Sequence, residues 1–259
     1  MSRDALLSVV PSVSPSALDS WERCPRAYAN RNLYGIAESD TGGTPDLGLL
    51  VHAMLKEVHE NGSCLDPDHV TEVLALHGID DGNAVAAMIR RHARRCPSAT
   101  AVGIHERELA RLHRETPMFI AVGRLDAMWK HDGILEVRDY KTGGQHLERV
   151  ADDPRAQLQA WLAAPLAAAR GLRLRVRYEY LAAEVVDDPD PLDADDETLA
   201  EITAHLVQTV EAIKDAAARE EFAAAADPEI CRTCAYRSIC PESAAPGVPS
   251  WSVPPEGHQ

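Results

Sequence analysis

The stretch of residues 102–140, which is rich in strand-forming residues, constrains the fold of this chain more than any other part of the sequence. It divides into Val102–His113, Met118–Lys130 and Ile134–Tyr140, and His131-Asp132-Gly133 between the last two is typical of a tight hairpin turn. We therefore expect consecutive antiparallel strands at the centre of the fold. Such a sheet must bury at least one face, so the flanking segments are expected to pack on it.

Segments with helical spacing of apolar residues lie on both sides of these strands. They are residues 14–31 with a break at Cys24-Pro25, then 46–60, 68–76, 83–95, 152–169 and 197–220, and a further strand is expected over Leu172–Val185. This order predicts a mixed α/β (α+β) fold, in which helices flank a small central mixed sheet.

The 259 residues are enough for one large domain with a substantial core. We assign this domain to residues 1–245. Its predicted parts are an N-terminal helix (14–31), a helical region (46–100), a core (101–185), a helix (197–222) and a cysteine-bearing loop (229–241). The Pro-rich tail, residues 246–259, is expected to be poorly ordered.

No apolar run approaches the ~18 residues that a membrane span needs, and the first residues do not form a secretory signal. We therefore expect a soluble, cytoplasmic protein without a membrane partner. Because disulfides are rare in that compartment, the six cysteines are expected to be reduced thiols or metal ligands.

The net charge of −15 is distributed unevenly along the chain. Between Glu184 and Glu229 there are 15 acidic residues and two basic ones, so the rest of the chain carries a charge of only −2. That remainder holds two groups of basic side chains, Arg90, Arg91, Arg94 and Arg95 in one and Arg173 and Arg175 in the other. These arginines either bind phosphates of a nucleic acid or simply solvate the faces of helices and strands.

Two carboxylates and a lysine mark the ends of the predicted hairpin strands. Asp126 follows Gly123-Arg124-Leu125 on one strand, whereas Asp139 and Lys141 lie two residues apart on the next strand and so share a face. Carboxylates suit Mg²⁺ or Mn²⁺, and an ammonium group can orient a metal-bound water, which together would hydrolyse a phosphodiester. An Asp-x-Lys pair also occurs by chance on surface strands, so the pair alone leaves both interpretations open.

The sequence resembles the PD-(D/E)XK nuclease superfamily, in the branch that holds the RecB and AddB nuclease domains and the CRISPR-adaptation nucleases. The resemblance is carried by six ordered motifs, which are Ser14-Pro15-Ser16 leading to Cys24-Pro25-Arg26-Ala27-Tyr28, Leu47–His52, Gly123–Asp126, Asp139–Gly143, Gln157–Trp161 and Cys231-x-x-Cys234 with Cys240. It implies a restriction-endonuclease-like core. Trp161 stands where the family has tyrosine, and residues 61–103 match no known motif.

The resemblance also implies roles for individual residues. His52, Asp126, Asp139 and the backbone carbonyl of Tyr140 would hold Mg²⁺ or Mn²⁺. Lys141 would activate the attacking water, and Gln157 would orient the strand or Lys141. Two further residues each have two possible roles. Glu108 is either an accessory acid or a solvated strand residue. Trp161 either stacks on a DNA base or packs in the core.

Three cysteines, Cys231, Cys234 and Cys240, are spaced as soft metal ligands, and Cys24 is the candidate for the fourth. The spacing suits a structural Zn²⁺ as well as a cluster. The resemblance favours [4Fe–4S], which would join the N-terminal and C-terminal segments. Cys64 and Cys96 are predicted to be ordinary thiols, and His59 to be a surface residue.

The function predicted from the sequence is a metal-dependent DNA nuclease, an exonuclease on single strands or DNA ends, in repair, recombination or defence. One alternative is a CRISPR-adaptation type of nuclease that trims DNA for an integration complex. The other is a non-catalytic iron–sulfur protein that binds DNA on a nuclease scaffold. No Walker A motif is present, so any helicase or repair partner would be a separate chain.

Overall fold

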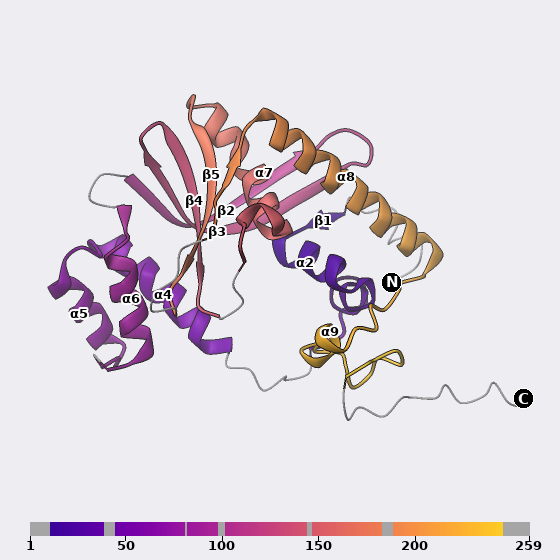
Figure 1. The fold of residues 1–259 in the computed structure, drawn as a ribbon, viewed down its shortest axis with the longest axis horizontal. Helices are drawn as coiled ribbons and strands as arrows, with labels where there is room; N and C mark the ends of the chain where they lie inside the picture. Colours follow the sequence, from indigo (N-terminus) through magenta and orange to yellow (C-terminus); the bar gives the residue numbers. More distant parts are fainter. Residues whose placement is uncertain are drawn as a thin grey trace, which may run out of the picture.

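A six-stranded sheet forms the centre of the computed structural model, which describes residues 11–38, 45–80, 82–97, 102–143, 147–182 and 189–245 (Figure 1). The strands are β1 (Ser12–Val13), β2 (Val102–His113), β3 (Phe119–His131), β4 (Ile134–Lys141), β5 (Arg173–Tyr180) and β6 (Leu192–Ala194). Strands β2, β3 and β4 are antiparallel neighbours, as predicted. The expected tail at residues 246–259 lies outside the described residues.

The helices are α2 (Pro15–Arg23), α3 (Pro25–Tyr28), α4 (Pro45–Asn61), α5 (Pro67–Leu76), α6 (Ala84–Ala93), α7 (Pro154–Ala168), α8 (Asp196–Arg219) and α9 (Pro228–Arg232). A π-helical turn, Ala29–Leu33, follows α3, and a 3₁₀ turn, Val150–Asp152, precedes α7. The predicted bend at Cys24-Pro25 is present, because Cys24 is extended and separates α2 from α3. No helix within the described residues is both long and apolar enough to span a membrane.

The sheet is mixed because α7 carries the chain from β4 back to β5, which pairs with β4 in parallel. Along one edge, the first half of β3 pairs with β1 and the second half with β4, whereas β2 pairs with β3 on the other edge. The tight turn between β3 and β4 has a positive φ at Asp132 (47°) and at Gly133 (73°), which is the conformation a two-residue hairpin requires.

Helices cover both faces of the sheet, as the sequence predicts (Figure 1). The larger core packs α2, α7 and α8 on one face, with Val137 and Val176 of the sheet fully buried against Leu158 and Leu206 of the helices. The second core packs α4, α5 and α6 on the other face around Trp129. The mixed fold with flanking helices is therefore confirmed.

Asp153 begins α7, the helix that packs between the sheet and α8. It is 3% exposed, accepts a hydrogen bond from the backbone N–H of Arg155 at 2.8 Å, and pairs with the guanidinium of Arg155 at 2.7 Å. Burial alone would raise the pKa of Asp153, but the hydrogen bonds and charge of Arg155 hold it below the usual value of an aspartate. The ionised carboxylate therefore stabilises the start of α7.

We predict that Asp153→Ala lowers the free energy of unfolding by about 2 kcal/mol at pH 7, because it removes a helix cap and a partly buried ion pair. The contribution of Asp153 is complete above the unfolded-state pKa of about 3.9 and is lost as the pH falls through the lower folded-state pKa. Urea denaturation at pH 7 and at acidic pH measures both effects. Asp152→Ala, at a side chain that is 61% exposed, is the control and should change stability by less than about 0.5 kcal/mol.

Candidate active site

His52, from the middle of α4, points at the ends of β3 and β4. Its Nε2 lies 3.0 Å from the backbone oxygen of Tyr140, and its Nδ1 lies 3.2 Å from Oδ1 of Asp126. The other carboxylate oxygen of Asp126 accepts a hydrogen bond of 2.8 Å from the backbone N–H of Tyr140. One carboxylate thus joins β3, β4 and α4.

At Asp126, the alternating side chains of β3 switch from one face of the sheet to the other. Leu125 packs in the core beneath α7, but Ala127, two residues further, packs in the core beneath α4 and α6. On the neighbouring strand β2, Glu106 lies between the paired positions His105 and Arg107 and has a φ of 50°. This left-handed conformation is uncommon for glutamate and is typical of functional sites. The side chain of Glu106 lies 4.0 Å from Nδ1 of His52.

Asp139 and Lys141, two residues apart on β4, face α7. The Nζ of Lys141 is 2.6 Å from Oδ2 of Asp139 and 4.0 Å from the centre of the Tyr178 ring. The side-chain amide of Gln159 on α7 donates a 2.7 Å hydrogen bond to the other oxygen of Asp139. Asp139 is therefore held from both sides.

Negative charge accumulates at this point, and it shifts the pKa values of the surrounding groups. Burial and the charge of Asp126 raise the pKa of Asp139, although Lys141 and Gln159 oppose the shift. Burial and Asp126 likewise raise the pKa of Glu106. Burial alone would lower the pKa of His52, but the hydrogen bond and charge of Asp126 raise it to about 9. The site thus attracts a cation.

The residues present fit a divalent metal ion. His52, Glu106 and Asp126 place ligand atoms within 4.8 Å of one another, and Asp139 adds a second aspartate to the same cleft. The carbonyl oxygen of the Gln159 side chain is buried without a hydrogen-bond partner and lies on the residue that holds Asp139. Oxygen and imidazole ligands of this kind suit Mg²⁺ and Mn²⁺. The surrounding cleft has a volume of about 750 Å³.

Comparison with known proteins identifies the family. The PD-(D/E)XK nuclease superfamily matches residues 12–241, which is most of the chain. The chain belongs to the PD-(D/E)XK nuclease superfamily. Nucleases of this superfamily use divalent metal ions, as the acidic site requires. A search of curated proteins found no match.

Two solved structures resemble the nuclease over most of its length. One is a protein from Eubacterium rectale named "Putative exonuclease", which is 12% identical, with a TM-score of 0.53 over 92% of this chain and 91% of that chain. The other is SSO0001, which is 17% identical, with a TM-score of 0.41 over 93% and 92% of the two chains. The likeness to the Eubacterium rectale protein supports the fold.

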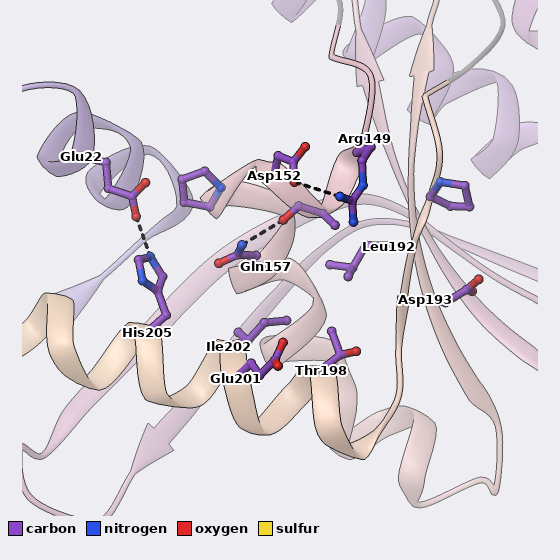
Figure 2. Close-up of a pocket in the computed structure, with 13 residues that line it drawn as sticks. Glu22, Arg149, Asp152, Gln157, Leu192, Asp193, Thr198, Glu201, Ile202 and His205 are labelled. Atoms are coloured by element: carbon purple, nitrogen blue, oxygen red, sulfur yellow. Dashed lines mark hydrogen bonds and ion pairs between the residues drawn. The ribbon is translucent and has the colours of Figure 1, made fainter.

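Gln157, which the family resemblance placed in the site, points elsewhere. Its amide donates a 2.9 Å hydrogen bond to the backbone oxygen of Ala151, in a separate cleft of about 630 Å³ between α7 and α8 (Figure 2). None of the residues that line this second cleft lines the acidic one. The residue that reaches Asp139 is Gln159, because two positions apart on a helix face nearly opposite directions.

For Glu108 and Trp161, the structure favours the second of the two roles predicted for each. Glu108 lies at the rim of the acidic cleft, where its carboxylate is 76% exposed and pairs with Arg124 at 3.0 Å, while Glu106 occupies the inner position. Trp161 is 1% exposed, packs against Phe119 and donates a hydrogen bond to Thr203. A ring so deeply buried cannot stack on a DNA base.

The predicted basic groups are mostly engaged within the protein. Arg91 donates a hydrogen bond to the backbone oxygen of Leu181, and Arg175 forms a two-bond pair with Asp193. Arg94 and Arg173 are exposed, whereas Arg90 and Arg95 are half-buried. The structure does not gather these six arginines at the acidic cleft, whose lining residues include none of them.

The four predicted cluster cysteines do come together. Cys24, Cys231, Cys234 and Cys240 line one small cavity. Helix α9 lies close to the N-terminal helices (Figure 1). The two sets of described ligand atoms that lie within 4.8 Å of one another are elsewhere.

We predict that Gln159→Ala reduces cleavage at least tenfold, because Asp139 loses a buried hydrogen bond that fixes its orientation. Gln157→Ala is the matched control, two residues away on the same helix, and should retain nearly full activity. Initial rates on linear DNA, compared at equal folded fraction by circular dichroism, measure the difference. Equal loss in both variants would remove Gln159 from the site.

Proposed function

We propose that this nuclease is a metal-dependent exonuclease that degrades DNA from its ends. The observation that carries the proposal is the convergence of His52, Asp126, Asp139 and Lys141 in one open cleft. The exonuclease assignment draws further support from the name of the similar Eubacterium rectale protein and from the resemblance to the RecB and AddB branch.

The side chains divide the chemical work between them. His52, Asp126 and Asp139, with Glu106 beside them, would hold Mg²⁺ or Mn²⁺. A divalent ion bound there would polarise the scissile phosphate and lower the pKa of an attacking water. Lys141 lies against Asp139 at 2.6 Å, so its ammonium group can orient that water or neutralise a phosphate oxygen. Gln159 keeps Asp139 in place through its 2.7 Å hydrogen bond.

A groove that adjoins the acidic cleft provides a path for a DNA strand. Lys141 and Arg155 line both the cleft and this groove, which has a volume of about 800 Å³ and extends past Arg23 to Arg232. Arg23 and Arg232 lie 4.0 Å from Asp19 and 2.7 Å from Glu229, but they are 52% and 65% exposed, and an ion pair at such an exposed position is weak enough to be exchanged for a phosphate. This groove, and not the arginine groups near residues 90–95 and 173–175, is the DNA path that we propose.

The cysteine cavity next to this groove would hold a [4Fe–4S] cluster. Thr233, which lies between Cys231 and Cys234, lines the groove, and its hydroxyl accepts a 3.4 Å hydrogen bond from Arg23. A cluster would therefore fix the wall of the DNA path without touching the acidic site. A partner that unwinds DNA or integrates it could supply the DNA ends or use the products, and a cytoplasmic location fits this role.

We predict that Asp139→Ala and Lys141→Ala abolish cleavage of end-labelled linear DNA while both proteins remain folded. The wild-type enzyme with Mg²⁺ or Mn²⁺ should degrade linear single strands and leave covalently closed circles intact, because an exonuclease requires an end. Gel analysis of both substrates measures this. Cleavage of circles at the same rate would make the enzyme an endonuclease, and full activity in the Asp139→Ala variant would refute the assignment of the site.

We predict that the double variant Arg23→Gln/Arg232→Gln weakens binding of single-stranded DNA and reduces the slope of log K against log salt by about 1.4, since each lost phosphate contact removes about 0.7. Fluorescence anisotropy in Ca²⁺, in place of the catalytic metal, measures the slope.

The matched control for that experiment is Arg173→Gln. Arg173 begins β5, whereas Tyr180 ends it and lines the groove, so about 23 Å of strand separates Arg173 from the DNA path. The control should bind like the wild type. A larger effect at Arg173 than at Arg23 and Arg232 would place the DNA on the other side of the sheet.

A further inference from the structure

Four side chains outside the acidic site form a compact group between α4 and α6. They are His59 near the end of α4, Cys64 in the loop that follows, His92 on α6 and Cys96 just after α6. Their ligand atoms all lie within 4.8 Å of one another. Cys64 is 2% exposed, His92 is fully buried and Cys96 is 9% exposed. The sequence predicted His59 at the surface, whereas the structure packs its half-buried ring against His105 and Trp129.

Two of the distances between these ligand atoms match a tetrahedral metal site. The Nε2 atoms of His59 and His92 are 3.2 Å apart, and Nε2 of His59 is 3.3 Å from the sulfur of Cys96. Around one zinc ion with bonds of about 2.05 Å to nitrogen and about 2.3 Å to sulfur, tetrahedral angles separate two nitrogens by about 3.3 Å and a nitrogen from a sulfur by about 3.6 Å. The group therefore needs only small adjustments to bind a metal.

The Nδ1 atom of each imidazole, which lies away from the centre of the group, already has a hydrogen-bond partner. The Nδ1 of His59 lies 2.6 Å from the backbone oxygen of Leu55, which can only accept, so this nitrogen carries the proton. The Nδ1 of His92 lies 3.1 Å from both carboxylate oxygens of Glu179, a side chain that is 1% exposed and also pairs with Arg138. Histidines that ligate metals are oriented in this way by a carbonyl or carboxylate on the other nitrogen.

In this arrangement lone pairs converge on one buried point, where a cation could bind them. When both rings are neutral and protonated on Nδ1, the lone pairs of the two Nε2 atoms point at each other across 3.2 Å. Two cysteine sulfurs lie beside them within the same 4.8 Å. As thiols the two cysteines can donate hydrogen bonds to these lone pairs, whereas as thiolates they add negative charge to them, and a positive ion among the four atoms would then bind all four.

We propose that His59, Cys64, His92 and Cys96 hold one structural zinc ion. Two thiolates and two imidazoles form a donor set that Zn²⁺ favours over Mg²⁺ or Mn²⁺, which prefer oxygen. The four ligands would fill a tetrahedral site and leave no position for substrate, so the ion stabilises and does not react. The spacing also fits, because each histidine is followed by its cysteine after three or four intervening residues.

The zinc would fix the position of α4, and hence of the catalytic histidine. His52 and His59 are seven residues apart on α4, nearly two helical turns, so they lie about 10 Å apart along the same side of the helix. A metal that ties His59 to α6 prevents α4 from rotating or sliding. It also anchors the helical region to β5 through His92 and Glu179.

The test measures zinc and iron separately in the purified full-length chain, prepared anaerobically without added chelator. The variants are Cys96→Ser and His92→Gln, with Cys240→Ser from the other cysteine group as the matched control. We expect Cys96→Ser and His92→Gln to lose one zinc per chain relative to the wild type, and Cys240→Ser to keep it. Equal zinc in the wild type and in the folded Cys96→Ser variant would overturn the proposal.

A second measurement covers the case in which the ligand variants do not fold. Cys240→Ser protein that has been freed of zinc is titrated with Co²⁺, whose visible spectrum reports tetrahedral geometry and sulfur-to-metal charge transfer. One equivalent of tetrahedral Co²⁺ with thiolate ligands, displaced by Zn²⁺, is the expected result. Lack of such a spectrum, or a disulfide between Cys64 and Cys96 in the anaerobic protein, would show that the group is a thiol and histidine core.

Discussion

The electrostatic repulsion between the carboxylates of Asp126 and Asp139 determines which groups must surround them at this end of the sheet. Two nearly buried carboxylates on adjoining strands cannot both stay ionised unless positive charge and hydrogen bonds surround them. The chain supplies Lys141 at 2.6 Å from one and His52 at 3.2 Å from the other, and the backbone N–H of Tyr140 donates to Asp126. His52 comes from α4 and the other two groups from β4, so the fold must bring α4, β3 and β4 together before the site exists. The same excess of negative charge is what a divalent metal ion would use.

Local sequence predicted the parts of the site that local geometry determines. Asp139 and Lys141 share a face because strands alternate, and the hairpin turn places them near Asp126. The sequence missed Glu106, because the positive φ of that residue breaks the alternation from which its facing would be judged. The sequence analysis placed Gln157 in the site, whereas the structure places Gln159 there, buried against Asp139. Helix α7 is apolar on most sides, so its sequence does not show which of the two glutamines faces the sheet.

The cysteines show a different limit of sequence reasoning. Cys231, Cys234 and Cys240 lie in one loop, so their spacing alone marks them as ligands. Cys64 and Cys96 lie 32 positions apart and have histidine partners, so only the packing of α4 on α6 brings the four together. The acidic stretch after residue 184 contributes Asp193 and Glu201 to the second cleft, because α8 packs against α7. The groove that we propose as the DNA path is mixed in charge, since Arg23, Lys141, Arg155 and Arg232 line it together with Asp19, Glu22, Asp152, Asp153 and Glu229.

Contacts between the two ends of the chain have a consequence for its synthesis. Arg26 bonds the backbone oxygen of Phe222 at 2.8 Å and the carboxylate of Glu242, while the hydroxyl of Tyr236 donates to the backbone of Ile36. These partners are about two hundred positions apart, so these contacts form only after residues 222–242 have left the ribosome. Strand β1 and helix α2 instead pack on the edge of β3 and on α7, which are synthesised much earlier. The N-terminal segment can therefore complete the sheet edge during translation, and its contacts with residues 222–242 follow.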